Sequence, residues 1–198
     1  MLISQDLLHA TTINLLYASG AILTFVILER LVYYVHLMAC RSRIAKAIAQ
    51  AVARDASNPL PELAAGKDVL TCSMQEYVDV QRKGGVTRHR IEDLSAALFL
   101  RVDGSVNRGL WILDTIVTAA PLLGLLGTIL GIMDTFQALS AGGVSDPSAV
   151  SRGIGSALFA TAIGIGTALY GLLGHNVLHR LGESLTEDFK GFLLEATA

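Results

Sequence analysis

The chain has 198 residues, of which 52% are hydrophobic and 16% are charged. Soluble domains usually carry about 25% charged residues, so this composition indicates a membrane protein. The formal net charge of −2 leaves no excess of basic residues for a nucleic-acid surface, and the two cysteines are too few for a disulfide-stapled secreted fold.

Three stretches with few charges are each long enough to cross a bilayer, which takes roughly 20 apolar residues in a helix. The expected spans are residues 12–39, 110–136 and 152–178. Glu29 and Arg30 fall inside the first span, and Asp114 lies near the start of the second. Met1 to Asn14 contains no Lys or Arg for the basic region of a signal peptide, so we expect the first span to be retained.

Basic residues are distributed unevenly among the segments that connect these spans. Eleven of the fifteen Lys and Arg residues fall in segment 40–109, whereas residues 1–11 and 137–151 contain none. Because basic loops stay in the cytoplasm, we expect segment 40–109 and the tail 179–198 to be cytoplasmic and the other two segments to be periplasmic. The predicted fold class is an all-α integral membrane protein with three transmembrane helices, N-terminus out and C-terminus in, and helical cytoplasmic extensions.

Segment 40–109 is expected to form helices that extend the spans into a cytoplasmic bundle. Ser42 to Ala53 should continue the first span, a second helix is expected from about Pro61 to Gln81, and a third should start near Thr87. A nucleic-acid patch would be the alternative use of this basic segment. Acidic residues alternate with the basic ones there, so we expect no nucleic-acid partner.

Small residues share one face of the second and third spans, and bulky residues share the other. On a helical wheel the small faces are Ala120, Pro121, Gly124, Gly127, Thr128, Gly131 and Thr135 in the second span, and Ser156, Ala160, Gly164, Thr167 and Gly171 in the third. Such faces let helices approach closely in lipid, where packing and hydrogen bonds drive association. Two alternatives stay open: packing within one three-helix chain, or lining the inside of a ring of subunits while the bulky faces meet lipid.

Two motifs in these spans resemble a known family. They are Ala-Pro-Leu-Leu-Gly-Leu-Leu-Gly-Thr-Ile-Leu-Gly-Ile-Met (residues 120–133) and Arg-Gly-Ile-Gly-Ser-Ala-Leu-Phe-Ala-Thr-Ala-Ile-Gly (residues 152–164). Both closely resemble the MotA/TolQ/ExbB proton-channel family of the bacterial inner membrane, and the ExbB and TolQ branch is nearest. The resemblance implies a homopentameric ring around the helices of an ExbD/TolR-like single-span partner that carries an intramembrane aspartate, and it allows a TonB/TolA-like protein as a further partner.

The same resemblance assigns roles to individual residues. Thr128 and Thr161 match the family's channel-lining threonines, whereas Ser156 stands where ExbB and TolQ usually carry a glutamate and Arg152 stands where they carry a proline. The expected channel-lining residues are Thr128, Ser156, Thr161, Ala160 and Gly164, and the expected helix-packing residues are Pro121, Gly124, Gly127, Gly131 and Gly171.

The third span contains no carboxylate, so the acid that carries the proton is expected to come from the partner. Asp114 and Asp134 lie near the ends of the second span, where each should reach water. The expected function is a stator or channel subunit that uses the proton-motive force to energise transport or another process at the outer membrane. Two alternatives remain: a non-conducting scaffold, motivated by Ser156, and a MotA-like motility stator.

Other chemistry has weaker support in the sequence. His175 and His179 are four residues apart on a helix, but no third ligand is evident, so we expect no metal site and no cofactor. The sequence contains no nucleophile elbow, phosphate-binding glycine loop with a lysine, or HExxH motif. We therefore expect that the chain is not an enzyme.

Overall fold

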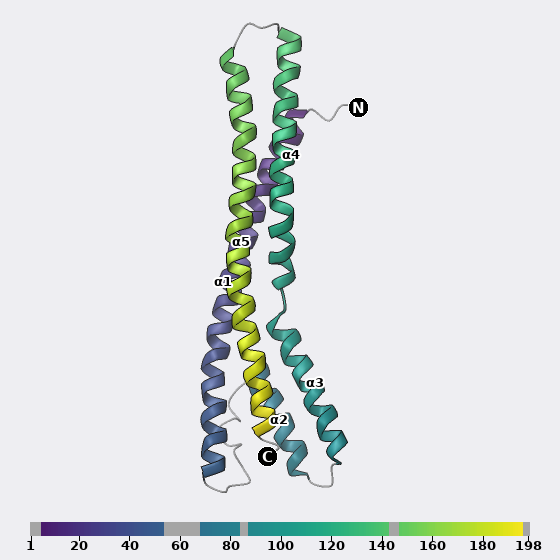
Figure 1. The fold of residues 1–198 in the computed structure, drawn as a ribbon, viewed down its shortest axis with the longest axis vertical. Coiled ribbons are helices and arrows are strands. Elements are labelled where there is room, and N and C mark those ends of the chain that lie inside the picture. The colour runs from purple at the N-terminus through teal and green to yellow at the C-terminus, as the bar shows by residue number, and fades with distance from the viewer. Residues whose placement is uncertain (1–4, 54–67, 84–86, 143–146, 196–198) are drawn as a thin grey trace. The chain divides into compact units, whose positions relative to one another are not determined.

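A computed structural model describes residues 5–53, 68–83, 87–142 and 147–195 (Figure 1). The described residues form five helices and no strand, which confirms the predicted all-α fold class. The helices are α1 (Gln5–Ala53), α2 (Val69–Arg82), α3 (Arg88–Val106), α4 (Leu110–Gly142) and α5 (Pro147–Glu195).

Three of these helices are long and apolar enough to cross a membrane. The apolar stretches are Ala10–Lys46 in α1, Leu110–Gln137 in α4 and Val150–Leu194 in α5. They confirm the three expected transmembrane helices. The side of the membrane that each end faces stays a prediction from the basic residues.

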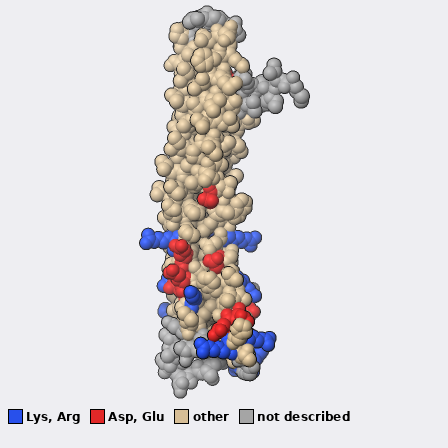
Figure 2. Space-filling view, turned by 45° about the vertical axis from the view of Figure 1, so that its right-hand side comes forward, with Lys and Arg blue, Asp and Glu red and all other residues tan. Residues whose placement is uncertain are grey.

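The chain forms two units, and α1 and α5 contribute to both. The first unit contains residues 1–28 and 109–176, and the second contains residues 29–108 and 177–198. Lys, Arg, Asp and Glu gather over the second unit in Figure 2, whereas the visible surface of the first unit is almost free of them. The first unit therefore has the surface of a membrane-embedded bundle and the second has that of a water-exposed one.

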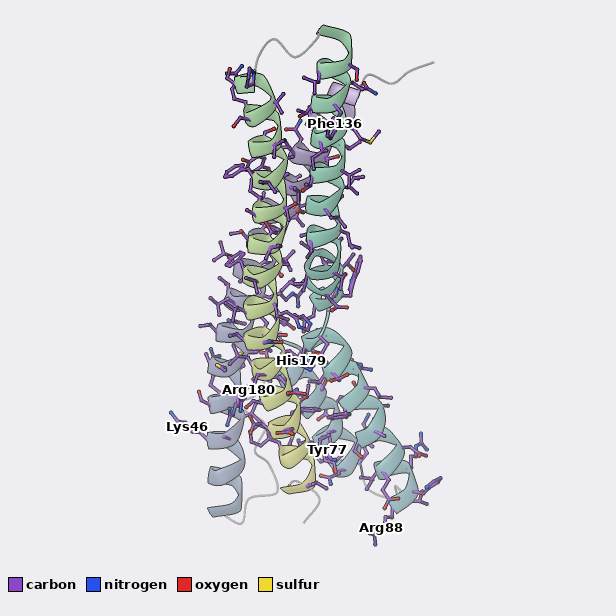
Figure 3. All side chains as sticks on the ribbon, turned by 45° about the horizontal axis from the view of Figure 1, so that its top comes forward. Lys46, Tyr77, Arg88, Phe136, His179 and Arg180 are labelled. Carbon is purple, nitrogen blue, oxygen red and sulfur yellow. The ribbon has the colours of Figure 1, made fainter. Side chains whose placement is uncertain are left out.

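The first unit packs α4 and α5 side by side (Figure 1), with α1 against both. Its central cluster consists of Leu16, Ala120 and Ala160, one residue from each of the three helices. Two of these three residues are alanines, so the helices come close together. Large side chains point outward instead, and Phe136, labelled in Figure 3, is 64% exposed.

The second unit packs α2, α3 and parts of α1 and α5 around a core of large side chains. Its largest buried residues are Tyr34, Leu37, Ile44, Met74, Tyr77, Leu98, Leu178, Leu185 and Phe189. Polar contacts join the helices around this core. The Tyr34 hydroxyl donates to the Val106 carbonyl at 2.9 Å, and Arg41 Nη1 lies 2.9 Å from Asp188 Oδ2.

Two expectations for the helical segments are confirmed and one is wrong. Helix α1 continues to Ala53, and α3 begins at Arg88 with Thr87 as its N-cap. The helix expected from Pro61 begins instead at Val69, because Asp68 has extended backbone angles and its carboxylate accepts a hydrogen bond from the Thr71 N–H at 3.0 Å. This is the geometry of an N-cap, which starts a helix. Residues 61–67, the rest of that expected helix, lie outside the described residues.

Candidate functional site

Thr128 of α4 and Thr161 of α5 meet at the contact between these helices. Their hydroxyl oxygens touch each other directly, and they lie 3.2 and 3.0 Å, respectively, from the same acceptor, the Gly124 carbonyl oxygen. Thr128 Oγ1 also lies 3.2 Å from the Ala157 carbonyl oxygen. Two hydroxyls and two backbone carbonyls from two apolar helices therefore converge at one place.

This arrangement determines which hydrogen bonds the two threonines can still form. Each hydroxyl carries one proton, and the contacts within the chain supply acceptors for both protons: one serves the contact between the hydroxyls and the other serves a carbonyl. The lone pairs that remain can accept a hydrogen bond or coordinate a cation. Both side chains are half-buried, so the site is open to a group from outside this chain.

Glycines allow the close helix approach that creates this site. A Cβ atom at Gly164 would lie 2.6 Å from the Ala120 carbonyl oxygen, and one at Gly124 would lie 3.1 Å from the Ala160 carbonyl oxygen. Gly127 faces Ala160 in the same way, with 2.9 Å between the added Cβ and the Ala160 Cβ. These contacts all lie within one chain, so these glycines pack the chain onto itself. Lining of a ring by the same faces stays a prediction.

Other residues assigned to packing also lie on the buried side of their helices. Gly131 is buried on α4, and Gly171 on α5 lies against Val117 and Leu23. Helix α4 continues through Pro121, which is half-buried. Because proline has no N–H, the carbonyl of Val117, four residues earlier, lacks its usual helical donor.

The residues assigned to the channel do not all come together. Ala160 is 1% exposed and Gly164 is also buried, so both belong to the packed contact between the helices and do not line an open surface. Ser156 is exposed, and its hydroxyl donates to the Gly153 carbonyl of its own helix at 2.8 Å. Its neighbour Ala157, not Ser156, is buried and supplies the carbonyl near Thr128.

Sequence reasoning did not identify the two backbone carbonyls of this site. Which carbonyls face a neighbouring helix depends on the crossing geometry, and no side-chain pattern encodes it. The glycine at position 124 was the available signal. A residue without a side chain leaves its own carbonyl and its neighbours open to close approach by another helix.

Of the two histidines of α5, His179 has a local contact within the helix. His179, labelled in Figure 3, places Nε2 3.4 Å from Glu183 Oε1, one turn further along the helix. Within the described residues, no group of three or more His, Cys, Asp or Glu side chains is arranged to hold a metal ion.

Comparison with known proteins agrees with the motifs in these helices. A model described as "MotA/TolQ/ExbB proton channel family" matches residues 63–190. The biopolymer transport protein ExbB of Helicobacter pylori is 39% identical over 85 residues, which cover 43% of this chain and 59% of that protein. The Tol-Pal system protein TolQ of Haemophilus influenzae is 36% identical over 85 residues, 43% of this chain and 37% of that protein. In both cases the match spans less than two thirds of the relative.

Proposed function

Because this chain belongs to the MotA/TolQ/ExbB proton channel family, we propose that it is a stator subunit of a channel that uses the proton-motive force across the bacterial inner membrane. It works as a homopentamer with an ExbD/TolR-like single-span protein. The complex energises transport or another process at the outer membrane, with a TonB/TolA-like protein as a further partner. The observation that carries the proposal is the convergence of the Thr128 and Thr161 hydroxyls between two apolar helices.

The partner supplies the titratable group in this proposal. A carboxylic acid within a membrane is costly and persists for function, and α5 carries none within residues 152–178. The two threonine hydroxyls use their protons inside the chain, so their free lone pairs suit the protonated form of a partner aspartate, which donates a hydrogen bond. The site then holds the proton-loaded partner helix.

A non-conducting scaffold is the second candidate, and Ser156 favours it. This residue takes the place of the family's usual glutamate, and its hydroxyl is bonded within α5. A ring that lost this acid and does not gain one from a partner would keep the fold without moving protons.

The topology of the proposal places the turn between α4 and α5 in the periplasm and α2 in the cytoplasm. A cysteine introduced as Ser148→Cys should react with a membrane-impermeant thiol reagent in cells whose outer membrane has been permeabilised. Native Cys72, which is exposed on α2, should stay unlabelled until the inner membrane is opened. The reverse labelling pattern would invert the topology.

Thr128→Val tests the function because it keeps the shape of the side chain and removes the hydroxyl. We expect proton-motive-force-dependent work in cells to fall by about two- to tenfold, which corresponds to the roughly 0.5–1.5 kcal/mol of one neutral hydrogen bond. Ser156→Ala should have a milder effect. Native mass spectrometry should show an unchanged assembly and reports the ring and partner counts.

Thr24→Val is the matched control for Thr128→Val. Thr24 lies in the apolar stretch of α1, and its hydroxyl donates to the Gly20 carbonyl of the same helix at 2.9 Å. Its replacement should leave activity unchanged. Full activity of the Thr128→Val, Ser156→Ala double variant would refute the role of these hydroxyls and favour the scaffold.

A further inference from the structure

Four residues of α4 lie along one line on the helix surface at intervals of seven positions: Asp114, Pro121, Thr128 and Thr135. Seven residues turn an α-helix by about 700°, so each member is displaced by only about 20° from the one before. The 21 residues from position 114 to position 135 rise about 32 Å, which matches the roughly 30 Å thickness of the hydrocarbon core of a bilayer.

Three members of this line carry a polar side chain, and the fourth, Pro121, frees a backbone carbonyl one turn earlier. Thr128 belongs to the threonine pair, and Pro121 leaves the Val117 carbonyl without its helical donor. Thr135 packs against Gly153 and its hydroxyl donates to the Gly131 carbonyl at 2.7 Å. Asp114 is exposed and the other three are half-buried, so the line follows the edge of α4 beside its contact with α5. A group outside the chain can therefore follow it.

Asp114 is the titratable member of the line, and no Lys or Arg among the described residues of the first unit lies beside it. Within the described residues, no hydrogen bond or ion pair involves its carboxylate. Arg152 is the one Lys or Arg residue among the described residues of the first unit. It adjoins Gly153, which packs against Thr135, so it lies at the opposite end of the line.

We propose that Asp114 is a proton-accepting residue at one end of the ion path that passes Thr128, a proposal that rests on the proposed channel function. Its carboxylate takes a proton from hydronium in the path, forming an O–H bond and leaving a water molecule. It then releases that proton to bulk water and returns to the carboxylate. In the proposed topology this end is cytoplasmic, so Asp114 discharges protons that have passed the threonine pair.

Asp114→Asn tests this role because it removes the charge at nearly constant shape. We expect proton flux in membrane vesicles from cells that make the whole complex to fall by about three- to tenfold. Asparagine cannot take up the proton, and it no longer attracts cations, an effect that reaches about tenfold or more where a whole cleft carries charges of one sign. The deficit should shrink at high ionic strength, which screens the carboxylate. Asp114→Glu should restore flux, and native mass spectrometry should show an assembled complex.

Asp134→Asn is the matched control, because Asp134 is an acid on the same helix that lies about 100° away from the line at Thr135. It should leave flux unchanged. Flux of the Asp114→Asn complex equal to that of the wild type, with Thr128→Val impaired, would overturn the role of Asp114 and leave the channel intact. A wild-type complex without proton flux would overturn the proposed function itself.

Thiol labelling tests the path without depending on flux. In a Cys72→Ser background, Asp114→Cys and Thr118→Cys should react with a small charged thiol reagent in the assembled complex, because position 118 lies within about 40° of the line. Leu126→Cys should stay unreactive, since that exposed residue lies about 120° from Asp114 and is expected to face lipid. Equal labelling of all three would overturn the proposal.

Discussion

The helices inside the first unit and the helices inside the second unit pack in different ways. In the first unit, the absence of side chains lets α4 and α5 touch through their backbones, as at Gly124 and Gly164. In the second unit, large side chains fill the core, and the hydroxyl of Tyr34 reaches across to the end of α3. The apolar unit therefore depends on glycines that let helices approach, whereas the charged unit depends on large buried side chains.

This difference has a functional consequence for the first unit. Lipid gives helices little hydrophobic drive to associate, so close contact and hydrogen bonds must provide it. Close contact also brings carbonyls near a neighbouring helix, and the Gly124 carbonyl oxygen lies 3.2 Å from the Thr128 hydroxyl and 3.0 Å from the Thr161 hydroxyl. The same glycines that pack the unit therefore build its polar site.

Gly164→Leu should have the largest effect on stability, because it prevents the close packing of the first unit. Even a Cβ atom at this position would lie 2.6 Å from the Ala120 carbonyl oxygen and 3.0 Å from the Gly124 Cα, and neither backbone atom can move freely. We expect a loss of at least about 1–3 kcal/mol of stability through overpacking, with loss of the threonine contact. Thermal denaturation in mild detergent, followed by size-exclusion chromatography, measures the effect.

Gly164→Ala and Gly166→Ala form a matched pair for this prediction. A Cβ at Gly166 meets nothing within 4 Å, so its replacement should be tolerated, whereas Gly164→Ala should already lower the melting temperature. Equal behaviour of the two alanine variants would contradict backbone contact as the basis of the first unit.

The sequence predicted the helices of both units better than the details of their contacts. Hydrophobic length identified the three spans, and Thr87 was correctly placed at the start of α3. The start predicted for α2 at Pro61, directly after a proline-containing break, was wrong, because Asp68 caps the helix through local hydrogen bonds to Thr71. Residues 61–67 of that expected helix lie outside the described residues.

In the candidate site too, the sequence identified some residues correctly and misplaced others. The family resemblance singled out Thr128 and Thr161, and the structure brings them together. Ser156 was placed on the same face as the buried Ala160, yet it is exposed. A helical wheel assigns angles on one helix, but the position of the contact on that wheel depends on how the neighbouring helix crosses.

Tyr34→Phe tests how much the buried side chains of the second unit contribute to its stability. Tyr34 is 0% exposed, and its hydroxyl satisfies the Val106 carbonyl, one of the terminal carbonyls that α3 itself leaves unpaired. Removing the hydroxyl leaves a buried acceptor without a donor, so we expect a loss of about 1–3 kcal/mol in thermal unfolding. Tyr33→Phe is the control: its hydroxyl lies 3.1 Å from Ser105 Oγ in a part-buried place where water can substitute. Equal losses would contradict this assignment.

Asp68→Ala should cost about 1 kcal/mol near neutral pH, the typical value of an N-cap. Burial by itself raises the pKa of Asp68, but hydrogen bonds from the Thr71 N–H and hydroxyl and from the Cys40 thiol hold that pKa below its usual value. The carboxylate therefore stabilises the folded state above the unfolded pKa of about 3.9, and this stabilisation is lost as the pH falls through the lower folded pKa.

The pH dependence separates the cap of Asp68 from general damage to α2. The difference between the wild type and Asp68→Ala should narrow as the pH falls below about 4. Thr87→Ala is the control, because Thr87 caps α3 without a side-chain hydrogen bond and its loss should change stability much less. A pH-independent difference for Asp68→Ala would assign its effect to packing.

Arg101→Ala should have the smallest effect, although its contact is short. Arg101 Nη1 lies 2.6 Å from Glu76 Oε2, but the two side chains are 57% and 43% exposed, so water and salt screen the pair. We expect a coupling energy of at most about 1 kcal/mol in a double-mutant cycle with Glu76→Ala, decreasing as salt is added. Helices α2 and α3 should then stay packed through buried residues such as Met74 and Leu98. A coupling well above this value would mean that ion pairs, and not the buried side chains, hold the second unit together.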